Sequence, residues 1–246
     1  MDISLIIPCY NEEASLAQLG DRLAVALERL ADHKVEILLV DDGSTDGTLV
    51  GLGRMADWLP GVRVISHTEN RGLGEALRTG YREATGDVLV GLDSDCTYDP
   101  AEIPEMLALL AGADVVLGSP YNPAGATANV PLSRLILSRT LSGMYRLVLG
   151  TPDIYTFTSI FRAHTREAAL AMESTATDYR ALTEMLVSLL DRDFRVVEYP
   201  TTLRSRVTGS SKMRVVRMVR RHALMVLRLA LTRPLRALLS REVRSA

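Results

Sequence analysis

The chain has 246 residues and a mass of 27.0 kDa, enough for one large α/β domain, and its 47% hydrophobic and 24% charged residues exclude a disordered chain. The net charge of −2 gives no indication of nucleic-acid binding, and two cysteines, Cys9 and Cys96, exclude a disulfide scaffold. The charge is uneven, however: residues 1–200 hold 16 Lys+Arg and 29 Asp+Glu, whereas residues 201–246 hold 12 Lys+Arg and one acid, Glu242. This distribution predicts that the basic C-terminal segment meets something anionic.

Short β-branched runs alternate with helical patterns over the first 120 residues. We expect strands at Ile3–Pro8, Val35–Asp41, Val62–Ser66, Asp87–Leu92 and Asp114–Gly118. We expect helices at Glu12–Leu30, Asp46–Trp58, Leu73–Ala84 and Ala101–Leu110. This alternation predicts an α/β fold with a mostly parallel central sheet flanked by helices. Such a sheet binds its ligands beyond the carboxyl ends of its strands.

The second half is less regular. In chain order we expect a loop at Asn122–Pro131, a helix at Leu132–Leu149, an irregular or β-like stretch at Thr151–Arg162, a helix at Asp178–Leu190, a strand at Arg195–Tyr199 and a polar loop at Thr201–Lys212. Basic helices should follow from Met213 to about Ser240, with a kink near Pro234. We therefore divide the chain into a catalytic domain, residues 1–212, and a basic amphipathic helical tail, residues 213–246.

The first apolar run stops at Pro8 and has no positively charged segment before it, so we expect no signal peptide. No uninterrupted stretch of about 18 apolar residues occurs, so we also expect no transmembrane helix. These features, together with the cysteine usage, predict a cytoplasmic protein.

Polar residues follow the first two strands. Tyr10 and Glu12 come directly after Pro8, and an aromatic ring with a carboxylate there would suit a base and a ribose; the alternative is a helix N-cap at Asn11. The second strand ends at Asp41-Asp42-Gly43-Ser44. Adjacent strand residues point to opposite sides, and we expect Asp42 to face the ligand and to accept a hydrogen bond from a uracil or guanine N–H.

The fourth strand is followed by Asp93-Ser94-Asp95. Two carboxylates so close together repel each other unless a cation lies nearby, and Mg²⁺ favours one or two carboxylates combined with phosphate oxygens. We therefore expect Asp93 and Asp95 to bind a metal and a nucleotide. Asp99, just before Pro100, is expected to cap the next helix.

The segment from Arg204 to Lys212 contains two arginines, a lysine, hydroxyl residues and a glycine. This composition suits a phosphate cradle, and the alternative is a solvated linker. Other functions lack their motifs: the chain has no Walker A sequence and no G-x-S-x-G, and its four histidines show no metal-ligand spacing.

These motifs, in this order, resemble those of the family 2 glycosyltransferases, and more closely a dolichyl- or polyprenyl-phosphate mannose synthase-like group. The resemblance covers roughly residues 3–212 and rests on Ile7–Glu12, Asp41–Thr48, Asn70–Gly74, Asp93–Asp95, Val116–Tyr121, Thr158–Arg162 and Arg206 with Gly209–Lys212. It implies a GT-A fold, a GDP- or UDP-hexose donor, Mg²⁺ or Mn²⁺ as cofactor and inversion at the anomeric carbon.

The resemblance also implies roles for individual residues. The nucleotide-binding positions are Pro8, Tyr10, Glu12 and Asp42. The metal-binding pair is Asp93 and Asp95, with Asp95 the better ligand. The loop that meets the phosphates is represented by Arg206, Ser211 and Lys212. Arg134 and Ser138 match an R-x-x-x-S helix whose arginine is a candidate for the acceptor phosphate.

Three positions depart from the family pattern: Thr97 stands where glutamine is usual, Pro120 replaces an arginine, and Ile160 replaces a glycine. These departures leave two alternatives to a polyprenyl-phosphate acceptor. One is a hydroxyl acceptor, on a lipid or a saccharide, with Asp178 or Glu184 as general base. The other is a nucleotide-sugar-binding protein without turnover.

The tail predicts a peripheral contact with the inner face of the membrane. Its predicted apolar side consists of Val216, Val219, Ala223, Val226, Leu227 and Ala230, with most arginines elsewhere. Such a helix suits a membrane interface, where each basic residue near an anionic leaflet contributes about 1 kcal/mol. The alternatives are a helix packed on the acidic body and a homo-oligomer interface.

Overall fold

The computed structural model describes residues 1–205 and 219–232. The elements follow one another as β1 (Asp2–Cys9), η1 (Glu13–Ser15), α1 (Leu16–Arg29), β2 (Lys34–Asp41), α2 (Thr48–Trp58), β3 (Val62–Ser66), α3 (Leu73–Glu83), β4 (Val88–Gly91), η2 (Pro100–Glu102), α4 (Ile103–Leu109), η3 (Leu110–Gly112), β5 (Val115–Ser119), β6 (Ala126–Ala128), α5 (Leu132–Leu149), β7 (Arg162–Thr165), α6 (Arg166–Ala171), α7 (Arg180–Leu190), β8 (Val196–Pro200) and β9 (Thr202–Arg204). A further helix covers residues 219–232. The elements labelled η are short 3-10 helices.

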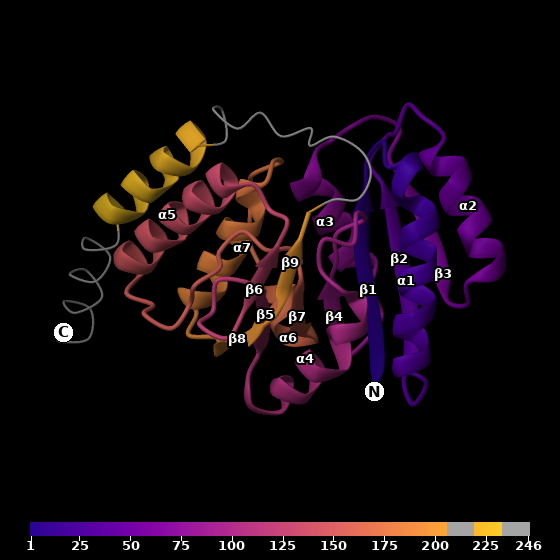
Figure 1. The fold of residues 1–246 in the computed structure, drawn as a ribbon, viewed down its shortest axis with the longest axis horizontal. Coiled ribbons are helices and arrows are strands. Elements are labelled where there is room, and N and C mark those ends of the chain that lie inside the picture. The colour runs from indigo at the N-terminus through magenta and orange to yellow at the C-terminus, as the bar shows by residue number, and fades with distance from the viewer. Residues whose placement is uncertain (206–218, 233–246) are drawn as a thin grey trace, which may run out of the picture.

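A seven-stranded sheet in the order β3-β2-β1-β4-β7-β5-β8 forms the centre of the molecule, and β6 pairs with β9 in a separate two-stranded sheet (Figure 1). Strand pairs β1–β2, β1–β4, β2–β3 and β5–β8 are parallel, whereas β7 runs antiparallel to both of its neighbours. The predicted α/β fold with a mostly parallel sheet is therefore confirmed. Because β2, β1 and β4 are neighbours and parallel, their carboxyl ends meet at one edge of the sheet.

Helices cover both faces of this sheet because successive strand residues point to opposite sides. Ile3, Leu5 and Ile7 of β1 pack with apolar residues of α1, α2 and α4. Ile6, between them, packs with α3, α6 and α7 on the other face. The result is a three-layer arrangement in which β1, whose residues from Ile3 to Cys9 are buried, is fixed from both sides.

The helix over residues 219–232 lies beside α5 (Figure 1). Its Val226 is buried in a core cluster with Tyr145 of α5, and Nδ1 of its His222 lies 2.9 Å from the Tyr145 hydroxyl. The predicted apolar side of the tail is therefore wrong in part, because Val226 packs inward on the protein body. The outward side instead carries Leu224, Leu227 and Leu231.

Some elements differ from the sequence prediction. α5 has the predicted bounds, and β1 to β5 differ from theirs by one residue at most at each end. The predicted first helix begins later, at Leu16 after η1, and the stretch predicted as irregular or β-like leads into β7. β7 has the sequence Arg-Ala-His-Thr and shows no apolar alternation, although Arg162 and His164 are both buried.

Candidate active site

A cavity of about 500 Å³ opens at the carboxyl ends of β1, β2 and β4. Five of the predicted site residues line it: Pro8, Tyr10, Glu12, Asp42 and Asp93. The rest of its wall consists of Cys9, Asn70–Leu73, Ala76, Ser94 and Thr177–Tyr179. The structure thus brings together residues from loops that lie far apart in the sequence, at the place that the sheet topology indicated.

The loops after β1 and β2 are tied to each other by side chain–backbone hydrogen bonds. The Asn11 backbone N–H donates to the Ser44 hydroxyl over 2.9 Å, and the Asn11 side-chain oxygen accepts from the Thr45 N–H over 2.7 Å. Glu13 accepts from the Gly47 N–H in the same way, over 3.0 Å. The alternative interpretation of Asn11 as a helix N-cap is therefore wrong, because its side chain holds the neighbouring loop.

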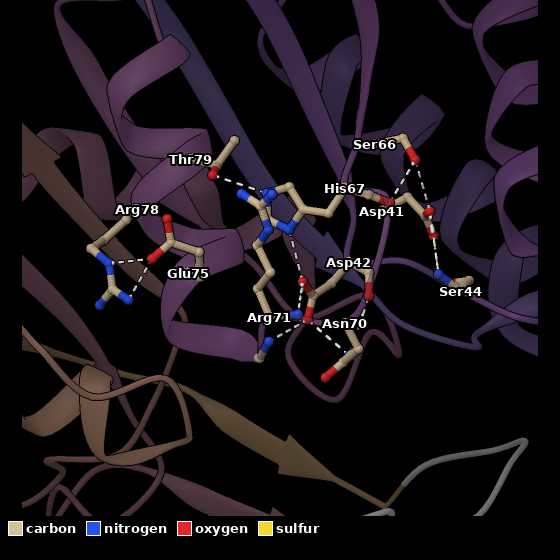
Figure 2. A network of polar contacts seen from close by, with 11 residues as sticks. Asp41, Asp42, Ser44, Ser66, His67, Asn70, Arg71, Glu75, Arg78 and Thr79 are labelled. Carbon is tan, nitrogen blue, oxygen red and sulfur yellow. Dashed lines mark hydrogen bonds and ion pairs between the residues drawn. The ribbon is translucent and has the colours of Figure 1, made fainter.

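Asp42 lines the cavity, but its carboxylate is held by the protein itself (Figure 2). Oδ1 lies 2.8 Å from Nδ1 of His67 and accepts from the Arg71 N–H over 2.9 Å, while Oδ2 accepts from the Gly72 N–H over 2.7 Å and from the Asn70 amide over 2.9 Å. A carboxylate offers about four acceptor sites, and all four have a donor here. The Asp42 carboxylate therefore organises the loop after β3, and the base contact expected of it stays a prediction.

Asp41, the neighbouring residue, points away from the cavity. Its carboxylate accepts from the Ser66 hydroxyl over 3.2 Å and lies 3.4 Å from the Ser44 N–H (Figure 2). Of the two adjacent aspartates, only Asp42 lines the cavity, and its contact with a ligand stays a prediction.

The glycines of the Gly72-Leu73-Gly74 segment serve a close approach between backbones. Gly72 has a φ of +89°, and a Cβ on it would lie 2.3 Å from the Thr177 carbonyl oxygen. A Cβ on Gly74 would lie 2.1 Å from the Ala176 carbonyl oxygen, and the Gly74 N–H donates to the Thr177 carbonyl over 2.9 Å. The start of α3 therefore packs directly on the 176–177 segment, whose Thr177 also lines the cavity.

The Asp93-Ser94-Asp95 loop follows β4. Asp93 lines the cavity, and Asp95 is 6% exposed. Thr97 contacts both carboxylates, since its N–H donates to Asp95 over 3.1 Å and its hydroxyl lies 3.4 Å from Asp93. Asp99 caps η2 as predicted, by accepting from the Ala101 N–H over 3.1 Å. Thr97, which departs from the family pattern, thus orients the aspartate pair.

The donor set of this loop fits a hard divalent cation. Within residues 1–205 and 219–232, no group of three or more His, Cys, Asp or Glu side chains could hold a metal by itself. Two carboxylates from one loop, beside a cavity that is open to a ligand, match the way in which Mg²⁺ is held jointly by protein carboxylates and substrate phosphates. Asp93 and Asp95 are the residues that would hold such an ion.

Arg134 lies on the first turn of α5 and is exposed. It is absent from the described residues that line the cavity, yet its charge acts on the buried Tyr98. Burial raises the pKa of the Tyr98 hydroxyl, a hydrogen bond with Ser159 lowers it, Asp93 raises it further and Arg134 lowers it. Tyr98 therefore lies within electrostatic reach of both Asp93 and Arg134. The other predicted phosphate-binding residues, Arg206, Ser211 and Lys212, lie outside the described residues.

Asp178 and Glu184, the two candidate general bases, are both engaged. Glu184 accepts from the N–H groups of Thr175 and Ala176 over 3.0 and 2.9 Å and so closes the loop before α7. Asp178 lines the cavity and accepts from the Arg180 guanidinium over 2.9 Å and from Arg221. Partial burial acts to raise the pKa of the Asp178 carboxyl, but the hydrogen bonds from these arginines outweigh it and hold the pKa below its usual range. A carboxylate with a lowered pKa is a weak base, so Asp178 is poorly suited to proton abstraction. The Glu184 carboxylate is engaged by the backbone of the loop before α7.

The sequence did not indicate His67, which contacts Asp42, nor Thr177 and Tyr179, which line the cavity on either side of the candidate base Asp178. No local sequence pattern marks either His67 or the 177–179 segment as part of the site. His67 follows β3 and meets an aspartate 25 positions away, and residues 177–179 reach the site only through the packing of α7 on α3.

The three-layer fold and the carboxylate-bearing cavity at the strand ends define an α/β protein with a ligand site at the carboxyl edge of its sheet. Residues 4–169 match the family described as Glycosyl transferase family 2, and the chain belongs to this family. It is a glycosyltransferase, as its motifs predicted, and the alternative of a protein without turnover finds no support in these comparisons.

Curated relatives cover most of the chain. It is 37% identical over 226 residues to the polyprenol monophosphomannose synthase of Mycolicibacterium smegmatis, which covers 85% of this chain and 80% of that protein. It is 34% identical over 216 residues to the dolichol-phosphate mannosyltransferase of Pyrococcus furiosus, which covers 87% of this chain and 60% of the relative, so the chain spans less than two thirds of that relative's length. The resemblance to polyprenyl-phosphate mannose synthases is therefore confirmed at the level of sequence similarity.

Solved structures confirm the GT-A fold. The glucosyl-3-phosphoglycerate synthase of Mycobacterium tuberculosis, in complex with phosphoglyceric acid, superposes with a TM-score of 0.69 at 23% identity, covering 93% of this chain and 80% of that one. The same enzyme with Mn²⁺, uridine diphosphate and glucosyl-3-phosphoglycerate superposes with a TM-score of 0.67 at 24% identity, covering 92% of this chain and 78% of that one.

Proposed function

We propose that this enzyme transfers a hexose from a GDP- or UDP-sugar to a polyprenyl phosphate, with mannose as the sugar to test first. The observation that carries the proposal is the cavity at the ends of β1, β2 and β4, where Tyr10, Glu12 and Asp93 lie together. Two relatives, a polyprenol monophosphomannose synthase and an undecaprenyl-phosphate mannosyltransferase, support the choice of sugar and acceptor.

The reaction needs no general base when the acceptor is a phosphate, because its oxygen is already ionised at neutral pH. That oxygen forms a bond to the anomeric carbon, and the bond from this carbon to the donor diphosphate breaks, with its electron pair leaving on the diphosphate. The engagement of Asp178 and Glu184 in hydrogen bonds supports an acceptor of this kind over a hydroxyl. Attack on the face opposite the leaving group gives inversion.

Different residues of this chain are proposed to bind the donor, the ion and the acceptor. Tyr10, Pro8 and Glu12, which line the cavity, would hold the nucleoside. Asp93 and Asp95, which Thr97 contacts, would hold the ion. Mg²⁺ or Mn²⁺, when bound, neutralises the charge that develops on the leaving diphosphate. Arg134 attracts the acceptor phosphate, and Arg206, Ser211 and Lys212 are proposed to contact the donor diphosphate.

The proposal is tested with the full chain, GDP-mannose or UDP-glucose, undecaprenyl phosphate in detergent, and Mn²⁺ or Mg²⁺. We expect a metal-dependent glycosylated lipid phosphate that is sensitive to mild acid. Asp95→Ala should lower the rate about 100-fold or more, since it removes a group that stabilises the leaving charge. Asp99→Asn, in the same loop but at the η2 cap, is the matched control and should retain most of the rate. Full turnover in Asp95→Ala, or a product formed only on a hydroxyl lipid, would contradict the proposal.

We also propose that the protein docks on the cytoplasmic face of an anionic membrane. Among the described residues, no helix is long and apolar enough to cross a bilayer. The helix over residues 219–232 nevertheless exposes Leu224, Leu227 and Leu231, each at least 56% exposed, together with Arg220 and Arg228.

The neighbouring helix α5 has an exposed apolar row of its own. It exposes Leu132, Ile136 and Leu147, which recur at helical spacing, and Arg139 lies among them. Apolar rows flanked by arginines on two adjacent helices suit an interface with anionic lipid, where a lipid-linked acceptor is located. The membrane contact expected of the basic tail is thus proposed for a two-helix surface.

A further inference from the structure

His67 lies directly behind the Asp42 carboxylate, at the end of β3 (Figure 2). Its Nδ1 is 2.8 Å from Asp42 Oδ1, and its Nε2 is 3.0 Å from the hydroxyl of Thr79 on α3. The His67 side chain is 6% exposed and that of Asp42 4%. An ionised carboxylate only accepts, so Nδ1 carries a hydrogen and donates it to Asp42, and the Thr79 hydroxyl can donate to Nε2. Both ring nitrogens are thereby satisfied, and the ring has one defined orientation.

The Asp42 carboxylate in turn holds the loop after β3 by hydrogen bonds. Its oxygens accept from the backbone N–H groups of Arg71 and Gly72 and from the Asn70 amide, over 2.7 to 2.9 Å. Asn70, Arg71 and Gly72 all line the cavity. Because three cavity residues are bonded to one carboxylate, a rotation of that carboxylate would move the whole wall.

This wall lies at the end of the cavity away from the aspartate pair. Asp42 follows β2 and Asp93 follows β4, and β1 lies between these strands. Asp42 and Asp93 are therefore separated by two strand spacings, which is about 10 Å. A donor whose diphosphate lies near Asp93 therefore places its nucleoside toward the Asn70–Gly72 wall.

We propose that His67 is a positioning residue for the nucleoside half of the donor: it holds Asp42, and Asp42 holds the Asn70–Gly72 wall. This inference rests on the proposed function, since it takes the ligand to be a nucleotide sugar. His67 touches no substrate in this arrangement and acts only through Asp42. Its loss should weaken contacts to the nucleoside and leave contacts to the diphosphate unchanged.

The experiment measures binding of UDP, GDP and inorganic pyrophosphate, each with Mn²⁺, to the full chain by calorimetry. His67→Ala removes the donor to Asp42, and we expect binding of the preferred nucleoside diphosphate to weaken about tenfold, the typical effect of losing one hydrogen bond to a charged group. His67→Asn retains an N–H donor at the Nδ1 position and should restore most of the affinity. Pyrophosphate should bind equally well to all variants.

Two further variants separate positioning from general damage to the fold. Thr79→Val leaves His67 in place and removes only its second partner, so we expect a smaller loss, about threefold, confined to nucleosides. Ser66→Ala changes the neighbouring residue, whose hydroxyl contacts Asp41, and should bind like the wild type. If His67→Ala does not fold, the Asn and Val variants still provide the comparison.

The outcomes distinguish this inference from the proposed function. If the wild type binds neither UDP nor GDP, the proposed function fails. If the wild type binds one of them and His67→Ala binds it equally well, the proposed function stands and the role of His67 is wrong. A parallel loss of pyrophosphate binding would also overturn the inference, because it would show damage to the whole site.

Discussion

The Arg221 guanidinium of the helix over residues 219–232 donates to Oδ2 of Asp178, a carboxylate that lines the cavity. Arg180 holds the other oxygen of the same carboxylate over 2.9 Å. Asp178 is thereby fixed by two arginines from different helices, and the helix over residues 219–232 is linked directly to the candidate active site.

This contact predicts that Asp178 is dispensable for the chemical step. The pKa of its carboxyl is held below the usual range, and both oxygens already accept hydrogen bonds, so it is a poor proton acceptor. Asp178→Asn should therefore lower kcat by about threefold at most, whereas loss of a general base costs about 100-fold or more. Initial rates at saturating donor and acceptor check this. A hundredfold loss with an unchanged thermal midpoint would reinstate Asp178 as a base and favour a hydroxyl acceptor.

A second prediction concerns acid stability and His164 of β7. Burial lowers the pKa of His164 to about 3, with a further contribution from Arg162, so the folded protein keeps the ring neutral. The unfolded chain binds a proton on this histidine below its ordinary pKa of about 6.5. The stabilisation is therefore fully present above pH 6.5 and is lost as the pH falls from 6.5 toward 3, at up to about 1.4 kcal/mol per pH unit.

His164→Phe keeps a ring against Tyr81 and removes the titrating group. We expect its free energy of unfolding, from urea titrations between pH 7 and 4, to fall less steeply with pH than that of the wild type. Equal slopes for the two proteins would contradict the prediction.

A third prediction follows from the close packing at Gly72. An alanine there would be held at a φ of +89° with its Cβ 2.3 Å from the Thr177 carbonyl oxygen. We expect Gly72→Ala to lower the free energy of unfolding by about 1–3 kcal/mol and to weaken nucleotide binding, because both walls of the cavity must shift. Gly53→Ala is the matched control: Gly53 lies within α2 with nothing within 4 Å of its Cβ position, so alanine should stabilise by about 0.5–1 kcal/mol. Urea midpoints for the two variants should therefore move in opposite directions.

The elements that the sequence predicted well are those whose signal is local. β1 to β5 are short apolar runs between turn residues, and α5 is bounded by Pro131 and Gly150, which has a left-handed φ of +68°. β7 was missed because Arg162 and His164 are buried through partners elsewhere: Arg162 donates to the carbonyls of Phe157 and Leu182. Leu182 is 20 positions away, and the Phe157 contact is to a backbone carbonyl, which no residue type reveals.

The same distinction between local signals and long-range contacts applies to the candidate site. The positions of Tyr10, Glu12, Asp42 and Asp93 followed from the rule that ligands bind at the ends of parallel strands, and the structure brings them together. The roles of Asp42 and Asp178 did not follow, because they depend on His67 and Arg221, which are 25 and 43 positions away. Residue type and strand position predict where a carboxylate lies, whereas its hydrogen-bond donors decide what it can do.

The last prediction tests the proposed membrane surface. Leu227 is 56% exposed on the outward side of the helix over residues 219–232, and Ile136 is 58% exposed on α5. Transfer of one leucine side chain from water into an apolar phase yields about 1.5–3 kcal/mol, so Leu227→Glu should weaken binding to phosphatidylglycerol vesicles by about tenfold or more, and Ile136→Glu should act similarly. Leu170→Glu, on α6 and 63% exposed, is the control and should bind vesicles like the wild type. Sedimentation with vesicles measures this, and gel filtration of the same variants separates it from self-association: a change from dimer to monomer without a change in vesicle binding would identify the surface as an oligomer interface instead.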